Sequence, residues 1–361
     1  MTENYVTGAT GFLGSHLVLQ LLRQQETVVA LVRGEDPRAR LLSALAKAGS
    51  YSASGPVAAD PANLEVITGN LRLPNCGVDI RDIRRAPGGI FWHLAANLRY
   101  MERNRADVFA DNVDGAREAI RLASSLGCRR FVHVSTAFTC GRQIGHIREQ
   151  LHGLDAVFNN VYEESKCHAE HLVVKEAEAA GMEWVIARPS IVIGPSTTWS
   201  SGGSNSGLYG FVHRLRSFNT MLRNYGPGAR LKCAGSMPMN FVAVDWVVRD
   251  LLILGKDPES RATIRHLTSD SSATAQETLD YVTTSLDIPA MIATEEEYSR
   301  PTFLETMISR QMEFYGNYFR YPKIFERSAP RQPIETHHVQ QAVKNFVAEI
   351  ESDRTRKAAI W

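Results

Sequence analysis

Short apolar runs alternate with longer segments of helical spacing along the first half of the chain. The runs are rich in Val, Ile and Phe, and each is followed by small or polar residues. Such runs are typical of buried strands, and strands that alternate with helices indicate a parallel sheet covered on both faces. The sequence therefore predicts an α/β fold with a doubly wound parallel sheet. The predicted strands are residues 5–7, 27–32, 64–68, 89–93, 130–134 and 183–187.

A glycine-rich turn follows the first strand and leads into a helix predicted over 16–25. Its three glycines are spaced Gly-x-x-Gly-x-x-Gly. In a dinucleotide site the first glycine permits the tight turn, the second lets the backbone approach the pyrophosphate, and the third allows close helix packing. A turn without a ligand is the alternative. The predicted cofactor contacts here are Gly8, Thr10, Gly11, Phe12, Leu13 and Gly14.

The second predicted strand ends at Arg33. A site specific for NAD places a carboxylate near this point to hold the ribose 2′-hydroxyl. Here that place holds Arg33, and Arg38 and Arg40 lie just beyond it. A guanidinium group fits a 2′-phosphate through paired hydrogen bonds. Arg33 therefore favours NADPH over NADH, and a solvated basic loop is the alternative.

A helix is predicted over 161–180, because no Pro or Gly interrupts it and it is rich in good helix formers. Tyr162 and Lys166 lie four residues apart, and so on one face. A free phenol has a pKa of about 10. A neighbouring cation stabilises the phenolate and lowers that pKa. The pair is therefore expected to transfer protons near neutral pH, although this spacing also occurs often by chance.

The residues that follow the other strands are small or carry hydroxyl groups. In open α/β sheets, ligands bind at the carboxyl ends of the strands. We expect these positions to border the cofactor or the substrate. They are Asn70 and Leu71, then Leu94, Ala95 and Ala96, then Ser135 and Thr136, and finally Pro189 and Ile191.

The composition changes after Gly194. A loop over 196–207, rich in Ser, Gly and Asn, is predicted to be mobile and near the site. Residues 241–254 resemble a strand end with a buried helix, 263–267 a further strand, and 275–286 and 303–315 helices. We predict a nucleotide-binding domain over 1–195, to which about 236–268 return, and a substrate-binding cap over 196–361. An aromatic cluster in the cap contains Tyr315, Tyr318, Phe319, Tyr321 and Phe325.

Composition narrows the class of protein. Of 361 residues, 44% are hydrophobic and 22% charged, as in ordinary globular proteins. The net charge of +1 produces no overall electrostatic field that would attract nucleic acid. The most apolar run, 241–254, contains three charges, so no transmembrane segment is expected. Five scattered cysteines without a Cys-x-x-Cys pair disfavour disulfides and zinc. With no room for a signal peptide before the first strand, we expect a cytoplasmic protein without a metal.

Several motifs, taken in order, resemble the extended short-chain dehydrogenase/reductase superfamily. Within it, residues 134–138 and 188–194 look most like the fatty-acyl-CoA reductase and thioester-reductase branch, sometimes called male-sterility-like. Beyond about residue 255 the resemblance fades. The matching pieces are Thr7 to Gly14, His93 to Ala96, Asn112-Val113-x-Gly115, His133 to Ala137, Tyr162-x-x-x-Lys166 and Arg188-Pro189.

This resemblance implies roles for the matching residues. Tyr162 would be the acid/base, and Lys166 would hold the nicotinamide ribose and lower the Tyr162 pKa. Thr136 would be the hydroxyl partner, with Ser135 in reserve. The family usually has Gly-Asp-Leu where this chain has Asn70, which would meet the adenine amine without a charge. Finally, Asn112 would support a proton relay, and Pro189 to Ile191 would lie against the nicotinamide.

The resemblance implies an NADPH-dependent reductase that converts an acyl thioester, on coenzyme A or a carrier protein, to an aldehyde or alcohol. Three alternatives stay open. One is a ketone or alcohol dehydrogenase for a bulky apolar metabolite, and another is a sugar-nucleotide epimerase or dehydratase, which normally keeps NAD bound. The third is a nucleotide-sensing protein without activity. The aromatic cluster would line a pocket, contact a membrane surface or form a homodimer interface, and core packing of the cap is the alternative.

Overall fold

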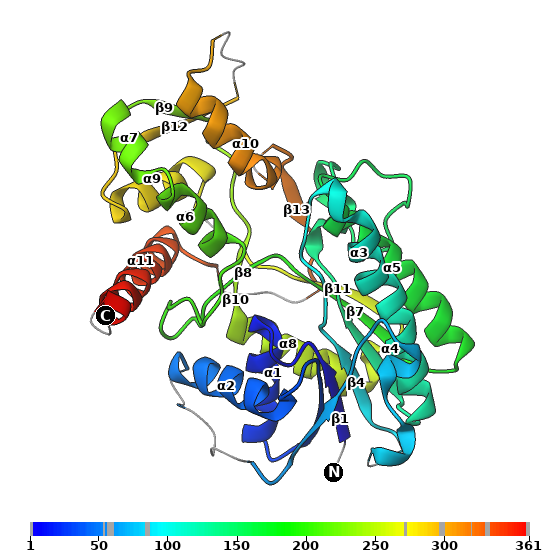
Figure 1. The fold of residues 1–361 in the computed structure, drawn as a ribbon. Helices are drawn as coiled ribbons and strands as arrows, with labels where there is room; N and C mark the ends of the chain where they lie inside the picture. Colours follow the sequence, from blue (N-terminus) through cyan, green and yellow to red (C-terminus); the bar gives the residue numbers. More distant parts are fainter. Residues whose placement is uncertain are drawn as a thin grey trace.

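A parallel sheet forms the centre of the molecule (Figure 1). The computed structural model describes residues 3–52, 55, 61–83, 87–270, 273–295, 300–318, 320–328 and 333–358. In this part of the chain the sheet has seven strands in the order β11-β7-β5-β4-β1-β2-β3, all parallel. The strands are β1 (Glu3–Thr7), β2 (Thr27–Val32), β3 (Leu64–Thr68), β4 (Ile90–His93), β5 (Arg130–Val134), β7 (Glu183–Pro189) and β11 (Thr263–Leu267).

Helices cover both faces of the sheet, which confirms the doubly wound arrangement (Figure 1). Successive side chains of a strand point to opposite faces, so Val6 of β1 packs with one group of helices and Tyr5 with the other. The strand order reverses between β1 and β4, where such sheets open a crevice for a ligand. One face carries α1 (Phe12–Arg23), α2 (Pro37–Ser50) and α8 (Val244–Lys256), and the other carries α4 (Gly115–Ser125) and α5 (Val161–Ala179).

Two predicted helices differ from the observed ones. The first begins at Phe12 rather than at 16, because Gly11 has the extended conformation of an N-cap residue (φ −77°, ψ 170°). The helix predicted around 107–125 is divided into α3 (Arg105–Phe109), the π-helical turn Ala110–Asp114 and α4. Wider turns of this kind occur mainly as single turns at functional positions.

The C-terminal part has a hydrophobic core of its own (Figure 1, upper left). The predicted helices at 275–286 and 303–315 are confirmed, and the second extends to Tyr318. A small parallel pair, β9 and β12, lies beside them. The elements of this core are α6 (Leu208–Arg216), α7 (Asn219–Tyr225), β9 (Ala229–Lys232), α9 (Ala275–Ser285), β12 (Met291–Thr294), α10 (Phe303–Tyr318) and α11 (Thr336–Ala358).

Two later segments pack against the N-terminal half. The predicted strand at 263–267 is β11, which pairs with β7 at the edge of the sheet, and α8 packs against α1. Farther along, β13 (Lys323–Phe325) pairs with β6 (Gly145–Ile147). Phe325 contributes to a small core beside the cleft. The exact domain boundary at 195 stays a prediction.

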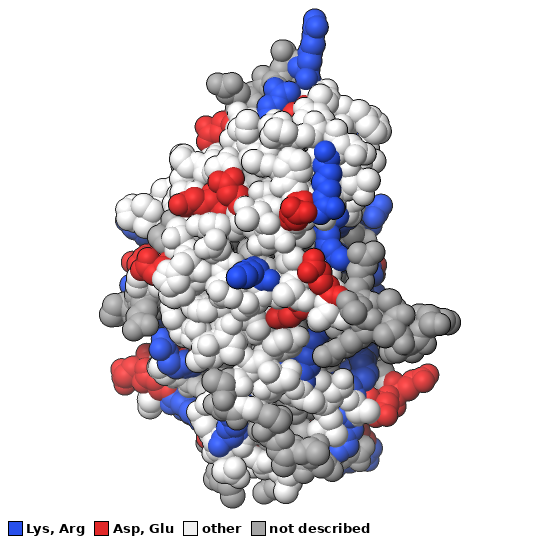
Figure 2. Space-filling model, turned by 90° about the vertical axis from the view of Figure 1, so that its left-hand side faces the viewer, with Lys and Arg blue, Asp and Glu red and all other residues white. Residues whose placement is uncertain are grey.

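No large patch of positive charge alone or negative charge alone is visible on the face seen from the left of Figure 1. There, basic and acidic residues are interspersed among uncharged ones (Figure 2). Among the described residues, no helix combines the length and the apolar character needed to cross a bilayer. All five cysteines are buried and free.

Candidate active site

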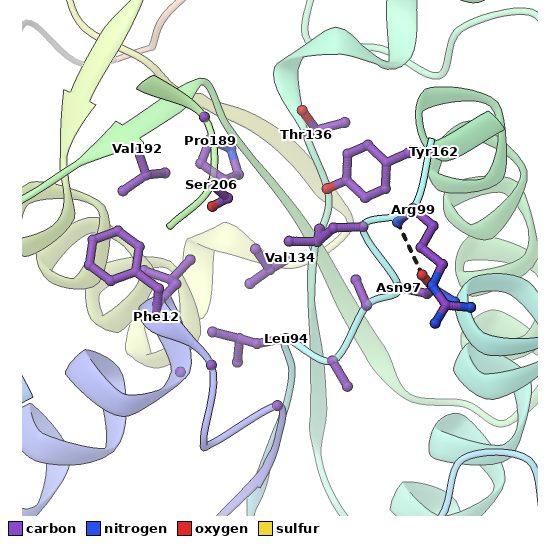
Figure 3. A pocket seen from close by; sticks show the side chains of 18 of the residues that line it. Phe12, Leu94, Asn97, Arg99, Val134, Thr136, Tyr162, Pro189, Val192 and Ser206 are labelled. Carbon is purple, nitrogen blue, oxygen red and sulfur yellow. Dashed lines mark hydrogen bonds between the residues drawn. The ribbon is translucent and has the colours of Figure 1, made fainter. Parts of the chain in front are cut away.

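A cleft of about 1150 Å³ opens at the carboxyl ends of the central strands, between the sheet and the C-terminal part (Figure 3). Pockets for one small ligand usually measure roughly 300–1,000 Å³. This cleft therefore has space for a dinucleotide and part of a second molecule. Its walls include the glycine turn, the ends of β2, β4, β5 and β7, the 205–208 segment, and side chains of α6 and α10.

The glycine turn is tight enough to exclude larger residues. Gly8 has φ +74°, and a Cβ there would lie 2.5 Å from the Ala95 nitrogen. A Cβ on Gly14 would lie 2.1 Å from the Gly8 carbonyl oxygen. The α1 N-terminus has no side-chain cap, so its N–H groups are available to an anion. These features fit the pyrophosphate of a dinucleotide.

The far end of the cleft is basic. Arg33, at the end of β2, and Arg40, on α2, both line it and are exposed. The Arg40 guanidinium donates a hydrogen bond to the Arg33 carbonyl oxygen, which holds the two residues together. Asn70 also lines this end, and its Oδ1 accepts a hydrogen bond from the Arg72 N–H at 3.1 Å. The arginines suit a phosphate on the adenosine ribose.

Tyr162 and Thr136 lie next to each other in the cleft (Figure 3). Thr136 follows β5, and its Oγ1 accepts a hydrogen bond from the Phe138 N–H at 3.3 Å. Ser135 is 4% exposed, and its Oγ has no hydrogen-bond partner among the described residues. Tyr162 occupies the first turn of α5 and is half-buried. The loop after β5 and the start of α5 thus bring three hydroxyl groups to one region.

Lys166 does not have the expected effect on Tyr162. Its Nζ donates a hydrogen bond to the Val134 carbonyl oxygen at 2.7 Å and lies 3.2 Å from His133 Nε2. Burial, followed by the charge of Glu163, raises the pKa of Tyr162 above its ordinary value. Burial also lowers the pKa of Lys166 to about 7. The predicted lowering of the Tyr162 pKa is therefore wrong for this structure, because desolvation dominates over the nearby amine.

Asn112 lies behind the cleft wall rather than on it. Its Nδ2 donates to Ser165 Oγ at 2.8 Å and to the Asn97 carbonyl at 3.1 Å, and its Oδ1 accepts from the Asn97 N–H at 2.7 Å. Ser165 in turn donates to the Tyr162 carbonyl oxygen. Asn112 thus joins the loop after β4 to the start of α5. Its predicted role in a proton relay stays a prediction.

The other predicted contacts line the cleft together with residues that sequence reasoning did not assign to it. The predicted ones are Thr10, Phe12, Leu13, Leu71, Leu94, Ala95, Ala96, Pro189 and Ile191. Arg99 also faces the cleft near Tyr162, and its N–H donates to Asn97 Oδ1 at 3.0 Å (Figure 3). Arg99 lies just beyond the small residues that follow β4. The expectation that residues after a parallel strand border the ligand would have found it, if applied a few residues farther along. Tyr315 and Tyr318 of the aromatic cluster line the cleft as well, whereas Phe319 lies outside the described residues.

The loop 196–207 borders the cleft through its last residues, but it is not free of the body. Ser196 donates to Asp245 through its N–H and its hydroxyl, and Thr198 donates to the Tyr51 carbonyl oxygen. The Ser201 N–H donates to Glu349 of α11. The loop is thus hydrogen-bonded to other elements at these points, and its predicted mobility stays a prediction.

The parallel sheet with its strand-order reversal, the glycine turn before α1 and the cleft with Tyr162 define an NAD(P)-binding oxidoreductase of the extended short-chain dehydrogenase/reductase class. The sequence model of the family "Male sterility protein" matches residues 6–251. This chain belongs to that family, and the resemblance inferred from the motifs is confirmed.

Two relatives are similar to part of this chain. Sterol demethylase protein B of Methylococcus capsulatus is 32% identical over 219 residues, which make up 59% of this chain and 58% of that protein. Fatty acyl-CoA reductase wat of Drosophila melanogaster is 31% identical over 184 residues, or 46% of this chain and 34% of that protein. The chain therefore spans less than two thirds of the length of either relative.

Solved structures agree on the fold. The terminal R domain of the myxalamid PKS-NRPS biosynthetic pathway has a TM-score of 0.73 at 19% identity, with 97% of this chain and 91% of that chain covered. UDP-glucuronic acid 4-epimerase from Bacillus cereus, in complex with NAD, has a TM-score of 0.64 at 16% identity, with 96% and 99% covered. At such identities the likeness concerns the fold alone.

Proposed function

We propose that this protein reduces the carbonyl group of an acyl thioester, held by coenzyme A or by a carrier protein, with NADPH as the reductant. The observation that carries the proposal is the adjacency of Tyr162 and Thr136 in a cleft large enough for cofactor and substrate together. The relative named fatty acyl-CoA reductase supports a thioester substrate.

In this proposal the two hydroxyl groups act on the carbonyl oxygen. A reduced nicotinamide bound in the cleft would supply the hydride for the carbonyl carbon. Thr136 donates a hydrogen bond to the oxygen, and Tyr162 gives it a proton as negative charge develops. A phenol with a raised pKa stays protonated until that charge appears. Ser135 is the reserve donor, and Lys166 would hold the ribose.

The preference for NADPH is part of the proposal. The uncapped N-terminus of α1 would face the pyrophosphate, and Arg33 and Arg40 would bind the 2′-phosphate by charge-assisted hydrogen bonds. Asn70 Oδ1 would accept a hydrogen bond from the adenine amine in addition to the one from Arg72. A carbonyl oxygen has two lone pairs, so it can accept both.

The test is NADPH oxidation, followed by absorbance, with two substrate series offered in parallel. One series contains acyl-CoA and acyl-pantetheine thioesters, and the other contains lipophilic ketones and aldehydes. Release of free thiol together with an aldehyde supports the proposal. Turnover of ketones or aldehydes alone contradicts it.

A second candidate is a ketone or alcohol dehydrogenase for a bulky apolar metabolite. The observation in its favour is the apolar wall that the C-terminal part adds to the cleft. The same wall would suit the acyl chain of a thioester, so the parallel assay distinguishes the two. The residues of this wall are Leu208, Phe211, Met239 and Phe241.

A further inference from the structure

A second phenol reaches the cleft from the C-terminal part. Tyr318, at the end of α10, lines the cleft and packs edge-on against Phe138, with ring centroids 4.7 Å apart. Its hydroxyl accepts a hydrogen bond from the Asn160 side chain and donates one to the Glu163 carboxylate. Burial raises the pKa of Tyr318 well above its ordinary value, and the charges of Glu163 and of Tyr162 add to the rise. The cleft therefore contains two phenols, contributed by different parts of the chain.

Glu163 is a fully buried carboxyl directly after Tyr162. It accepts hydrogen bonds from the Asn159 N–H at 3.1 Å, Asn159 Nδ2 at 3.4 Å and Asn160 Nδ2 at 3.3 Å. Asn160 Oδ1 accepts from the Glu163 N–H, so these bonds cap α5. Capping does not require the hydrogen bond from Tyr318, which comes from a different element. That bond points to a role beyond helix formation.

The surroundings of Glu163 allow it to hold a proton near neutral pH. Burial raises its pKa to about 7, while hydrogen bonds and Lys323 act in the opposite direction. The titratable groups that face it are Tyr162 on α5, Tyr318 on α10, Lys323 on β13 and the Cys140 thiol. Burial raises the pKa of Cys140 to about 12, so that thiol stays neutral. Glu163 is thus the member of this group that can exchange a proton at pH 7 without breaking the cap.

Thioester reduction consumes one proton in total. Tyr162 cannot be its source, because Tyr162 gives up a proton in the first step and takes it back in the second. In the first step hydride adds to the carbonyl carbon and the Tyr162 proton goes to the oxygen, which gives a hemithioacetal. In the second step the carbon–sulfur bond breaks, and the hydroxyl returns its proton to the Tyr162 phenolate. The departing thiolate therefore needs one proton from another acid.

We propose that Tyr318 is a second acid of the cleft, which protonates the departing sulfur, and that Glu163 is the positioning residue that restores the Tyr318 proton. When Glu163 is protonated, its hydrogen bond with Tyr318 reverses and runs from the Glu163 carboxylic acid to the Tyr318 oxygen. The Tyr318 proton then passes to sulfur, the Glu163 proton passes to the Tyr318 oxygen, and solvent later reprotonates Glu163. This inference rests on the proposed thioester reduction.

The test measures the two steps separately in single turnovers of Tyr318→Phe and Glu163→Gln. Phenylalanine keeps the ring that packs on Phe138, and glutamine keeps a side chain able to cap α5. NADPH absorbance reports hydride transfer, and a thiol-reactive dye reports release of pantetheine from an acyl-pantetheine. We expect hydride transfer within about twofold of wild type and thiol release slowed about a hundredfold, the usual scale of general-acid catalysis. Tyr225→Phe, at an exposed tyrosine on α7, is the matched control.

The pH profile supplies a second readout. In wild type, thiol release should fall as pH rises through about 7, because Glu163 loses its proton, and Glu163→Gln should lack this limb. If both steps slow equally in Tyr318→Phe, or neither slows, the second-acid role is overturned while thioester reduction stands. If the wild type reduces only ketones or aldehydes, the proposed function and this inference both fail.

Discussion

The Lys166 Nζ donates a 2.7 Å hydrogen bond to the Val134 carbonyl oxygen at the end of β5. This bond ties α5 to the end of β5, directly before Ser135 and Thr136. Lys166 is 1% exposed, and no carboxylate forms an ion pair with it among the described residues. A buried amine with carbonyl and imidazole neighbours loses its charge easily, because burial penalises the ammonium form.

The stability of the protein should depend on the proton of Lys166. Its folded-state pKa of about 7 lies below its ordinary value of 10.5, so between these values the unfolded chain binds more protons. Raising the pH from about 7 to 10 should stabilise the wild type relative to Lys166→Met, by at most about 1.4 kcal/mol per pH unit. Urea unfolding at several pH values measures this difference. Parallel profiles for the two proteins would show that Lys166 keeps its ordinary pKa.

Replacement of Tyr162 by phenylalanine should remove turnover but not cofactor binding. The phenol is the proposed proton donor, and loss of general-acid catalysis typically costs about 10²–10⁴-fold. NADPH fluorescence titration should give an unchanged Kd, while kcat falls. Near wild-type turnover in this variant would remove Tyr162 from the mechanism.

Arg33→Ala and Arg40→Ala should each weaken NADPH binding and leave NADH binding unchanged. A charge-assisted hydrogen bond contributes about 1.5–3 kcal/mol, so the Kd for NADPH should rise roughly ten- to hundredfold. Arg38→Ala is the control, because Arg38 is a basic residue on α2, the helix that also carries Arg40. An equal loss of affinity for NADPH and NADH would mean that these arginines do not bind the 2′-phosphate.

Alanine substitutions at two glycines of the turn should have different effects, one on the stability of the fold and the other on cofactor binding. Gly14→Ala places a Cβ 2.1 Å from the Gly8 carbonyl oxygen, a backbone atom that cannot move freely. We expect it to destabilise the fold by about 1–3 kcal/mol, as overpacking usually does.

Gly11→Ala is the matched comparison, since its Cβ would lie 3.2 Å from the same oxygen and Gly11 has an ordinary φ of −77°. That variant should fold with nearly wild-type stability but bind NADPH more weakly, because the methyl group occupies the approach to the pyrophosphate. Thermal unfolding and cofactor titration of both variants check the pair. A stable Gly14→Ala protein would contradict the packing argument.

Local patterns were sufficient to predict much of the sheet and one end of the site. A run such as Thr27–Val32 is buried on both faces, so nearly every residue in it is apolar, and the signal survives in a single sequence. The glycines reveal the turn because only residues without a Cβ fit there. Since parallel strands end at one edge, the positions after each strand could be assigned to a common cleft.

The chain by itself determined the elements, the glycine turn and the Tyr162–Lys166 spacing, because these depend on neighbours in sequence. Only the tertiary structure determined the pKa values of the buried groups and the part of the cleft wall that the C-terminal part contributes. The pKa of Tyr162 depends on burial, which outweighs the amine one helical turn away. Tyr318 meets Glu163 across about half the chain, and no local period encodes such a contact. Long-range packing therefore sets the protonation of groups in a cleft whose lining residues the sequence had largely predicted.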